Sequence, residues 1–163
     1  MSPPLVFAGV FTEKPNPRKG LIEIKLLVAA KGVIIKGGRA LILIRSEAEM
    51  ENGEFDYIEE IDLPGGIIQA HEKVEDGLIR EIKEETNLDV EVLMPLKVSD
   101  NFGPGLHIVG VLYLCRYLGG EVALGTEHRD YKWVSRKELN RESASWAYER
   151  IELAFDMFEK HFQ

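Results

Sequence analysis

Apolar stretches separated by short polar or glycine-rich segments run along most of the chain. Stretches of this kind, rich in Val, Ile and Leu, predict β-strands. Gly37-Gly38 predicts the turn of a hairpin between the strands Leu21–Ile35 and Arg39–Arg45. Lys31-Gly32 is a candidate break within Leu21–Ile35. The predicted strands are Leu5–Phe11, Leu21–Ile35, Arg39–Arg45, Tyr57–Leu63, Val90–Val98, Leu106–Tyr117, a short strand near Val122, and Tyr131–Val134.

Two stretches have apolar residues at helical spacing, and they predict helices over Glu72–Thr86 and Arg141–Phe162. The polar segments Ser46–Phe55 and Asn101–Gly105 are expected to be surface loops. The resulting order is strands, helix, strands, helix. It predicts an α/β (α+β) fold in which a mixed β-sheet is sandwiched between helices. A chain of this length can bury one core, so we expect a single domain over residues 1–163.

Composition narrows the classes of function. The formal charge is −8 and no long basic run occurs, which argues against binding to a nucleic-acid polymer. No apolar run approaches the length of a membrane span, and the N-terminal residues lack the pattern of a secretory signal. The single cysteine, Cys115, excludes an internal disulfide and suits a reducing cytoplasm. We expect a cytoplasmic protein in which Cys115 is a small buried hydrophobe.

Candidate chemistry lies on the first predicted helix. Glu81, Glu84 and Glu85 stand at positions i, i+3 and i+4, so their carboxylates share one face. Such a trio is often an ordinary solvated face. However, Gly65-Gly66 places a glycine turn, where backbone can approach closely, just before the same helix. Hard oxygen ligands gathered in this way suit Mg²⁺, with Mn²⁺ as the alternative.

The spacing of these residues resembles the Nudix box, G-x5-E-x7-R-E-U-x-E-E-x-G-U, in which U is apolar. Eight of the nine specified positions match. Asn87 replaces the final glycine, and we expect it to be tolerated as a left-handed helix cap. His71 stands where many members carry glycine. The matching residues are Gly66, five residues, Glu72, seven residues, and then Arg80-Glu81-Ile82-Lys83-Glu84-Glu85-Thr86-Asn87-Leu88. The segment from Glu127 to Val134 also resembles the family.

The resemblance implies roles for the residues of the box. Glu84 and Glu85 would bind Mg²⁺ directly, and the Gly66 carbonyl would add a backbone ligand. Glu81 would be either a third metal ligand or the base that deprotonates the attacking water. Arg80 would pair with a glutamate, Glu72 being the candidate, and hold the carboxylates in place.

Two residues outside the box complete the candidate site. A glutamate in the region of Glu127 acts as base or extra ligand in some relatives, and the alternative is an ordinary surface carboxylate. Arg45 ends an apolar strand and could reach a substrate phosphate, although an exposed strand-end charge is the simpler interpretation. His107 and His128 have no metal-type spacing, so we expect ordinary polar or loop positions for both.

The implied reaction is Mg²⁺-dependent cleavage of a pyrophosphate bond in a small nucleotide. Leu63-Pro64-Gly65-Gly66 resembles the nucleotide-sanitising branch, which favours a (deoxy)nucleoside triphosphate converted to monophosphate and pyrophosphate. ADP-ribose is the alternative, since Pro104 lies 16 residues after Leu88 and such hydrolases tend to carry a proline there. Dinucleoside polyphosphates remain open. A non-catalytic nucleotide-binding module is the alternative of another class, but such modules usually lose box carboxylates. The apolar N-terminal segment is compatible with a homodimer.

Overall fold

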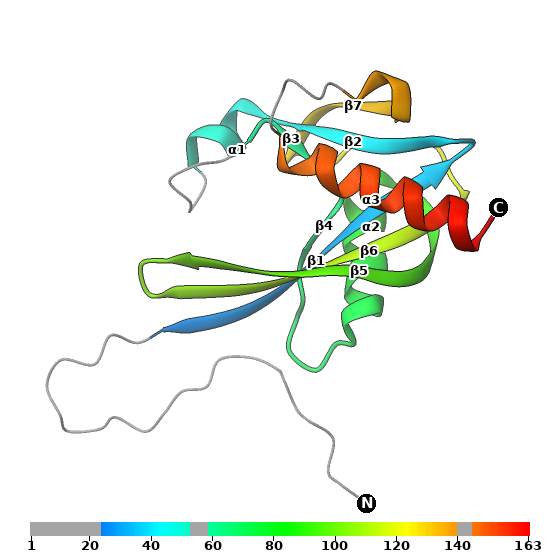
Figure 1. The fold of residues 1–163 in the computed structure, drawn as a ribbon. Helices are drawn as coiled ribbons and strands as arrows, with labels where there is room; N and C mark the ends of the chain where they lie inside the picture. Colours follow the sequence, from blue (N-terminus) through cyan, green and yellow to red (C-terminus); the bar gives the residue numbers. More distant parts are fainter. Residues whose placement is uncertain (1–23, 53–58, 140–144) are drawn as a thin grey trace, which may run out of the picture.

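The computed structural model describes residues 24–52, 59–139 and 145–163 of the chain (Figure 1). The described part contains seven strands, three α-helices and one short 3-10 helix. The strands are β1 (Lys25–Lys36), β2 (Arg39–Arg45), β3 (Ile61–Asp62), β4 (Gly65–Ile67), β5 (Asp89–Gly103), β6 (Leu106–Gly119) and β7 (His128–Ser135). The helices are α1 (Glu47–Asn52), α2 (Val74–Thr86), α3 (Trp146–His161) and the 3-10 turn η1 (Arg136–Glu138).

The strands form one mixed sheet in the order β3-β2-β1-β6-β5, with β4 pairing with β1 and β7 pairing with β2. Only the β1–β6 pair is parallel, and it runs from Lys25–Leu106 to Ile35–Arg116. The predicted hairpin at Gly37-Gly38 is confirmed, because both glycines have positive φ and β1 pairs with β2 beside them. No break occurs in β1 at Lys31-Gly32. Instead, β1 pairs with β4 there and with β2 further on.

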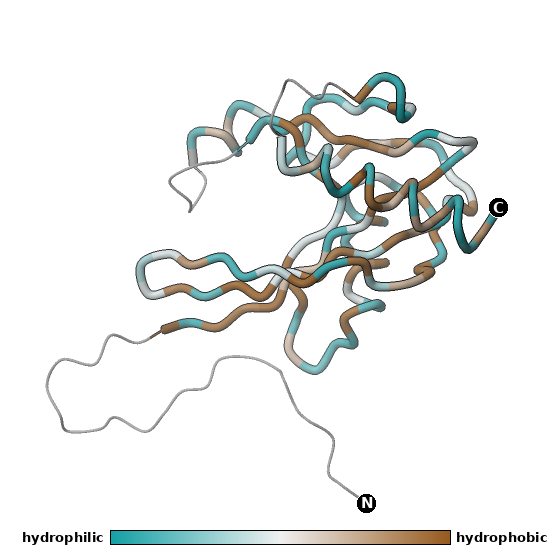
Figure 2. The backbone as a smooth tube through the Cα atoms, in the orientation of Figure 1, coloured by the Kyte–Doolittle hydropathy of each residue, from teal (hydrophilic) through white to brown (hydrophobic). Residues whose placement is uncertain are grey.

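Helices α2 and α3 cover opposite faces of the sheet (Figure 1). Alternation along β1 explains this arrangement. Val33 and Ile35 pack in the cluster that contains Ile151 of α3, whereas Ile34 packs in the cluster that contains Leu78 of α2. Hydrophobic residues are concentrated on the central strands, and polar ones on the outer segments (Figure 2). The predicted fold, a mixed sheet between helices, is confirmed.

Three local predictions were wrong. The segment after Arg45 contains helix α1 rather than only loop, because the Ser46 hydroxyl accepts a hydrogen bond from the Glu49 amide and caps it. Strands β5 and β6 extend through the predicted loop at Asn101–Gly105 and leave a tight turn at Pro104-Gly105. The expected strand near Val122 does not form.

Other predicted elements are shorter in the structure or lie outside the described residues. Of the strand expected over Tyr57–Leu63, the described residues form only β3, and β4 was missed because its two glycines suggested a turn. The strand predicted over Leu5–Phe11 lies outside the described residues, as does the start of the helix predicted over Arg141–Phe162. None of the described helices combines the length and apolar character needed to cross a membrane.

Candidate active site

The glycine turn before α2 is bound tightly to strand β1. Gly65 has a φ of +129°, and a Cβ added to it would lie 2.1 Å from the carbonyl oxygen of Ala30. A side chain therefore cannot be placed at this residue without moving backbone. The Lys31 ammonium donates a hydrogen bond of 2.8 Å to the Gly65 carbonyl. These contacts fix the turn next to the carboxylates of α2.

Glu81 lies directly over the second glycine of the turn. A Cβ added to Gly66 would lie 2.5 Å from Oε2 of Glu81 and 2.8 Å from its carboxyl carbon. The absence of a side chain at residue 66 thus makes room for this carboxylate. The structure brings together the Gly66 backbone and Glu81, as the box pattern predicts.

Arg80 joins three glutamates of the box. Its Nε and Nη2 donate to the two carboxylate oxygens of Glu72 at 2.7 and 3.0 Å, which is the two-pronged geometry that suits a guanidinium. Its Nη1 donates to Glu81 at 2.6 Å and reaches Glu84 at 3.3 Å. The hydrogen bonds from Arg80 and from the Gln69 amide hold the pKa of Glu72 at about 2. The predicted Arg80–Glu72 pair is confirmed.

The loop and helix around Glu72 adopt conformations that allow this pairing. His71 has a φ of +65°, the left-handed region that glycine adopts most easily, which accounts for glycine being common there in the family pattern. Gly77 lies against the same carboxylate, since a Cβ there would be 2.7 Å from Oε2 of Glu72. Asn87 has a φ of +62° and its amide donates to the Lys83 carbonyl, so the expected left-handed cap is confirmed.

Glu85 contacts the first glycine of the turn and is buried, with 8% of its surface exposed. Its Oε2 accepts a hydrogen bond of 2.7 Å from the Gly65 amide. Burial raises the pKa of Glu85 to about 7, against the opposing effects of the Lys31 charge and the Gly65 amide. A carboxylate in such a position is stabilised by any cation that approaches it.

Glu127 lies next to Glu85, although 42 residues separate them in sequence. The segment before Glu127 is attached to the end of α2, because the amides of Ala123 and Gly125 donate to the carbonyls of Thr86 and Glu85. One carboxylate oxygen from each glutamate and one ring nitrogen of His128 lie within 4.8 Å of one another. The structure therefore places Glu127, which is exposed, beside Glu85 of the box; a role for it as base or ligand stays a prediction.

Asp62 is a buried residue of this region that the sequence pattern did not single out. Its carboxylate is 1% exposed and contacts Lys31 at 3.0 Å, Arg45 at 2.9 Å and His128 at 3.1 Å. Burial alone would raise the pKa of Asp62. The charge of Lys31, the hydrogen bond from His128 and the charge of Arg45 outweigh it and hold the pKa at about 2. The sequence feature that could have identified Asp62 is its position between two apolar residues, Ile61 and Leu63.

Two expectations change with this arrangement. The prediction that His128 is an ordinary polar or loop residue was wrong, since it begins β7 and is buried against Asp62. The guanidinium of Arg45 is also not an exposed strand-end charge, because it pairs with Asp62 and donates to the Glu59 carbonyl at 3.1 Å. A role for Arg45 toward a substrate phosphate stays a prediction.

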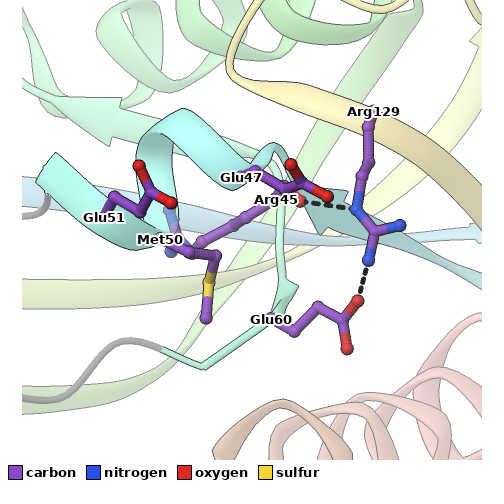
Figure 3. Close-up of a pocket in the computed structure, with 6 residues that line it drawn as sticks. All are labelled: Arg45, Glu47, Met50, Glu51, Glu60 and Arg129. Carbon is purple, nitrogen blue, oxygen red and sulfur yellow. Dashed lines mark hydrogen bonds and ion pairs between the residues drawn. The ribbon is translucent and has the colours of Figure 1, made fainter.

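A pocket of about 260 Å³ lies between β2, α1 and the start of β7 (Figure 3). Arg129 spans it, donating to the Arg45 carbonyl at 3.1 Å and pairing with Glu60. Met50 offers an apolar surface in the same pocket. A backbone hydrogen bond connects the pocket with the carboxylate site, because the Ser46 amide donates to the Glu127 carbonyl. Its lining residues are Arg45, Glu47, Met50, Glu51, Glu60 and Arg129.

The donor set fits a hard divalent cation. Glu81 and Glu85 of α2 contact the glycine turn, Glu84 lies within reach of Arg80, and Glu127 adds a carboxylate from the neighbouring loop. Oxygen ligands of this kind suit Mg²⁺ and Mn²⁺. The residues that could hold such an ion are Gly66 through its carbonyl, and Glu81, Glu84, Glu85 and Glu127 through their carboxylates.

Comparison with known proteins agrees with this geometry. The model of the NUDIX domain matches residues 25–154. An ADP-ribose pyrophosphatase from Methanocaldococcus jannaschii is 28% identical over 78% of this chain and 72% of its own length. A putative 8-oxo-dGTP diphosphatase 2 from Mycobacterium tuberculosis is 31% identical over 69% of this chain and 76% of its own.

Solved structures support the same assignment. A MutT protein from Methanosarcina mazei has a TM-score of 0.66 at 25% identity, covering 86% of this chain and 97% of its own. An ADP-ribose pyrophosphatase from Streptococcus suis, at 22% identity, shares the fold with a TM-score of 0.59, covering 80% and 90% of the two chains. With the family model covering most of the chain and the box residues assembled on α2, this chain belongs to the Nudix hydrolase family.

Proposed function

We propose that this chain is a Mg²⁺-dependent pyrophosphohydrolase that acts on a (deoxy)nucleoside triphosphate and releases the monophosphate and pyrophosphate. The observation that carries the proposal is the contact of Glu81 with Gly66 and of Glu85 with the Gly65 amide, with Arg80 bridging Glu81 and Glu84. A non-catalytic module has no need for this arrangement, because nucleotide binding alone does not require several carboxylates beside an anionic substrate.

Each residue has a distinct part in the proposed reaction. When bound, the cation would neutralise phosphate oxygens and lower the pKa of bound water, so that the hydroxide nucleophile is no longer repelled by the anionic pyrophosphate. Glu84 and Glu85, with the Gly66 carbonyl, hold it. Arg80 does not contact substrate in this proposal. It orients the carboxylates so that the reacting groups meet in one geometry.

We assign the proton acceptor to Glu81 rather than to Glu127. Arg80 fixes one oxygen of Glu81 at 2.6 Å, and the other oxygen lies over Gly66, where the pyrophosphate would be approached. Glu127 instead lies beside Glu85 and His128, a grouping better suited to a cation than to a proton acceptor. The pH dependence of kcat distinguishes Glu81 from Glu127, because substitution of the residue that acts as the base eliminates the acidic limb of the profile.

ADP-ribose is the second candidate substrate, and the relative named ADP-ribose pyrophosphatase favours it. Pro104, the residue that favours ADP-ribose in the sequence, lies far from the box in the folded chain. Pro104 lies in the turn of the β5–β6 hairpin, which projects beyond the rest of the sheet (Figure 1). The pocket beside β2 is the candidate for recognition of the nucleotide, with Met50 as an apolar contact; its two arginines, Arg45 and Arg129, are paired with Asp62 and Glu60.

A hydrolysis screen with Mg²⁺ tests the proposal. Nucleoside and deoxynucleoside triphosphates, ADP-ribose, sugar nucleotides and dinucleoside polyphosphates are supplied in parallel, and the products are separated by ion-exchange chromatography. We expect the highest kcat/KM for a triphosphate, with pyrophosphate rather than phosphate as the second product. Preferred cleavage of ADP-ribose would identify the second candidate as the substrate. An absence of cleavage for every compound would contradict the catalytic assignment.

A further inference from the structure

Three groups that can accept hydrogen bonds or bind a cation meet beside the end of α2. They are the carboxylates of Glu85 and Glu127 and one ring nitrogen of His128, all within 4.8 Å of one another. Glu85 and His128 are buried, at 8% and 4% exposure. Glu127 is exposed. A buried carboxylate and a buried nitrogen lone pair are costly to bring together unless a cation or a proton lies between them.

Asp62 determines which nitrogen of His128 is available. Nε2 lies 3.1 Å from Oδ2 of Asp62. The Asp62 carboxylate is held ionised by Lys31 and Arg45, and an ionised carboxylate only accepts hydrogen bonds. Nε2 therefore carries the proton and donates it to Asp62. This leaves Nδ1 as the nitrogen with a free lone pair.

Nδ1 of His128 is buried and has no hydrogen-bond partner among the described residues. A buried polar atom without a partner destabilises the folded chain, so its presence calls for a ligand. A histidine whose second nitrogen donates to a carboxylate is the arrangement that orients imidazole ligands in metal sites. Asp62 and His128 match that arrangement.

We propose that Nδ1 of His128, with the carboxylates of Glu85 and Glu127, binds a divalent cation that accepts nitrogen as well as oxygen ligands, namely Mn²⁺ or Zn²⁺. Imidazole suits such ions, whereas Mg²⁺ prefers oxygen alone. Metal–ligand bonds of about 2.0–2.2 Å place two ligands of one ion up to ~4.4 Å apart, so small side-chain rotations complete the site. The site would lie next to the Mg²⁺ of the proposed function and share Glu85 with it.

The direct test uses the intact chain with Mn²⁺ alone and no nucleotide. Electron spin echo envelope modulation detects ¹⁴N coupling when an imidazole nitrogen is bonded to Mn²⁺, and carboxylate ligands give no such signal. We expect a ¹⁴N modulation that changes to the ¹⁵N pattern when the histidines are ¹⁵N-labelled. A Mn²⁺ spectrum without nitrogen coupling would overturn the proposal.

Two variants test which histidine supplies the nitrogen bonded to Mn²⁺. His128→Gln should abolish the modulation and weaken Mn²⁺ binding at this site by about tenfold to a hundredfold. His107→Gln is the matched control, because His107 pairs with the partly exposed Asp100 in the β5–β6 hairpin. Loss of the modulation in His107→Gln, or its retention in His128→Gln, would contradict the assignment.

Two further measurements keep this inference separate from the proposed function and from folding. Glu84→Gln removes a ligand of the proposed Mg²⁺ but none of this site, so it should lose turnover and keep the nitrogen modulation. If His128→Gln does not fold, the wild-type chain decides through ¹⁵N NMR of its histidines. Zn²⁺ should shift the His128 Nδ1 resonance. An unchanged resonance would overturn the proposal.

Discussion

The Cα of Gly66 lies so close to Glu81 that a Cβ at residue 66 would be 2.5 Å from Oε2 of that glutamate. The clashing atoms belong to the end of a flexible side chain, not to backbone. A methyl group at this position would therefore displace the carboxylate and leave the fold in place. The glycine at this position matters for the site more than for the turn, in contrast to Gly65, whose Cβ would meet backbone of β1.

Gly66→Ala should therefore lower activity while changing stability little. We expect kcat to fall by about tenfold or more, because the displaced Glu81 no longer meets the reacting geometry. The melting temperature should change by only a few degrees. Gly103→Ala is the control, since a Cβ there would be 3.8 Å from Leu106, an ordinary contact. Unchanged kcat in Gly66→Ala would contradict the role given to this contact.

The apolar stretches predicted the layers of the fold because consecutive residues of the central strands are buried on both faces of the sheet, Ile34 toward α2 and Val33 and Ile35 toward α3. Arg39–Arg45 was predicted with the bounds that β2 has, and α2 ends at the predicted Thr86. Residues whose structure depends on partners far away in sequence were predicted less well. Strand β4 contains Gly65 and Gly66 and forms only because β1 offers it three pairing positions.

The candidate site was predictable where its residues lie on one helix. Local spacing places Glu81, Glu84 and Glu85 on one face whatever the tertiary fold is. It says nothing of Asp62 and His128, which meet across 66 residues of chain. Their contact depends on how β3 and β7 both pair with the C-terminal end of β2, Asp62 opposite Leu43 and His128 opposite Arg45, and only the folded sheet contains that information.

Arg80→Lys tests the two-pronged contact with Glu72. A lysine keeps the positive charge but cannot donate to both oxygens of Glu72 and to Glu81 at once. We expect kcat to fall by about tenfold to a hundredfold, the range seen when groups that orient ligands are lost. Arg116→Lys is the control, because Arg116 makes an exposed pair with Glu91. Steady-state kinetics would contradict the prediction if both variants kept the wild-type kcat.

Glu84→Gln should lower turnover by orders of magnitude while the chain remains folded. The side chain of Glu84 is 60% exposed, so the substitution leaves no buried group unpaired and the circular dichroism spectrum should not change. The loss arises because an amide is a poorer ligand for a hard cation than a carboxylate. EDTA should abolish the wild-type activity, and added Mg²⁺ should restore it. Full turnover by Glu84→Gln would exclude Glu84 as a ligand.

Cys115 should resist thiol reagents in the folded chain. It is fully buried, as expected from the sequence, and burial raises its pKa to about 12. The thiolate is the reactive form, so raising the pH to about 9 should not start the reaction, although an ordinary cysteine is largely ionised there. Denaturing guanidinium chloride should expose the thiol and allow rapid modification. Stoichiometric labelling of the folded chain at that pH would contradict the burial.

Asp62→Asn tests the buried charge cluster through the pH dependence of stability. The folded pKa of Asp62 is about 2 and its ordinary value is 3.8, so the ionised form is favoured by folding. This contribution is complete above about pH 4, declines as the pH falls toward 2, and is lost below that. A shift of this size corresponds to roughly 2–3 kcal/mol in the free energy of unfolding.

Urea unfolding from pH 7 to pH 2 would measure this contribution. The free energy of unfolding of Asp62→Asn should be lower than that of the wild type by a constant amount above pH 4, and the two curves should converge in acid. Asp89→Asn is the control, because Asp89 forms an exposed pair with Lys83 and should change stability by less than about 1 kcal/mol. Parallel curves for Asp62→Asn and the wild type down to pH 2 would show that Lys31 and Arg45 do not lower the pKa of this carboxylate.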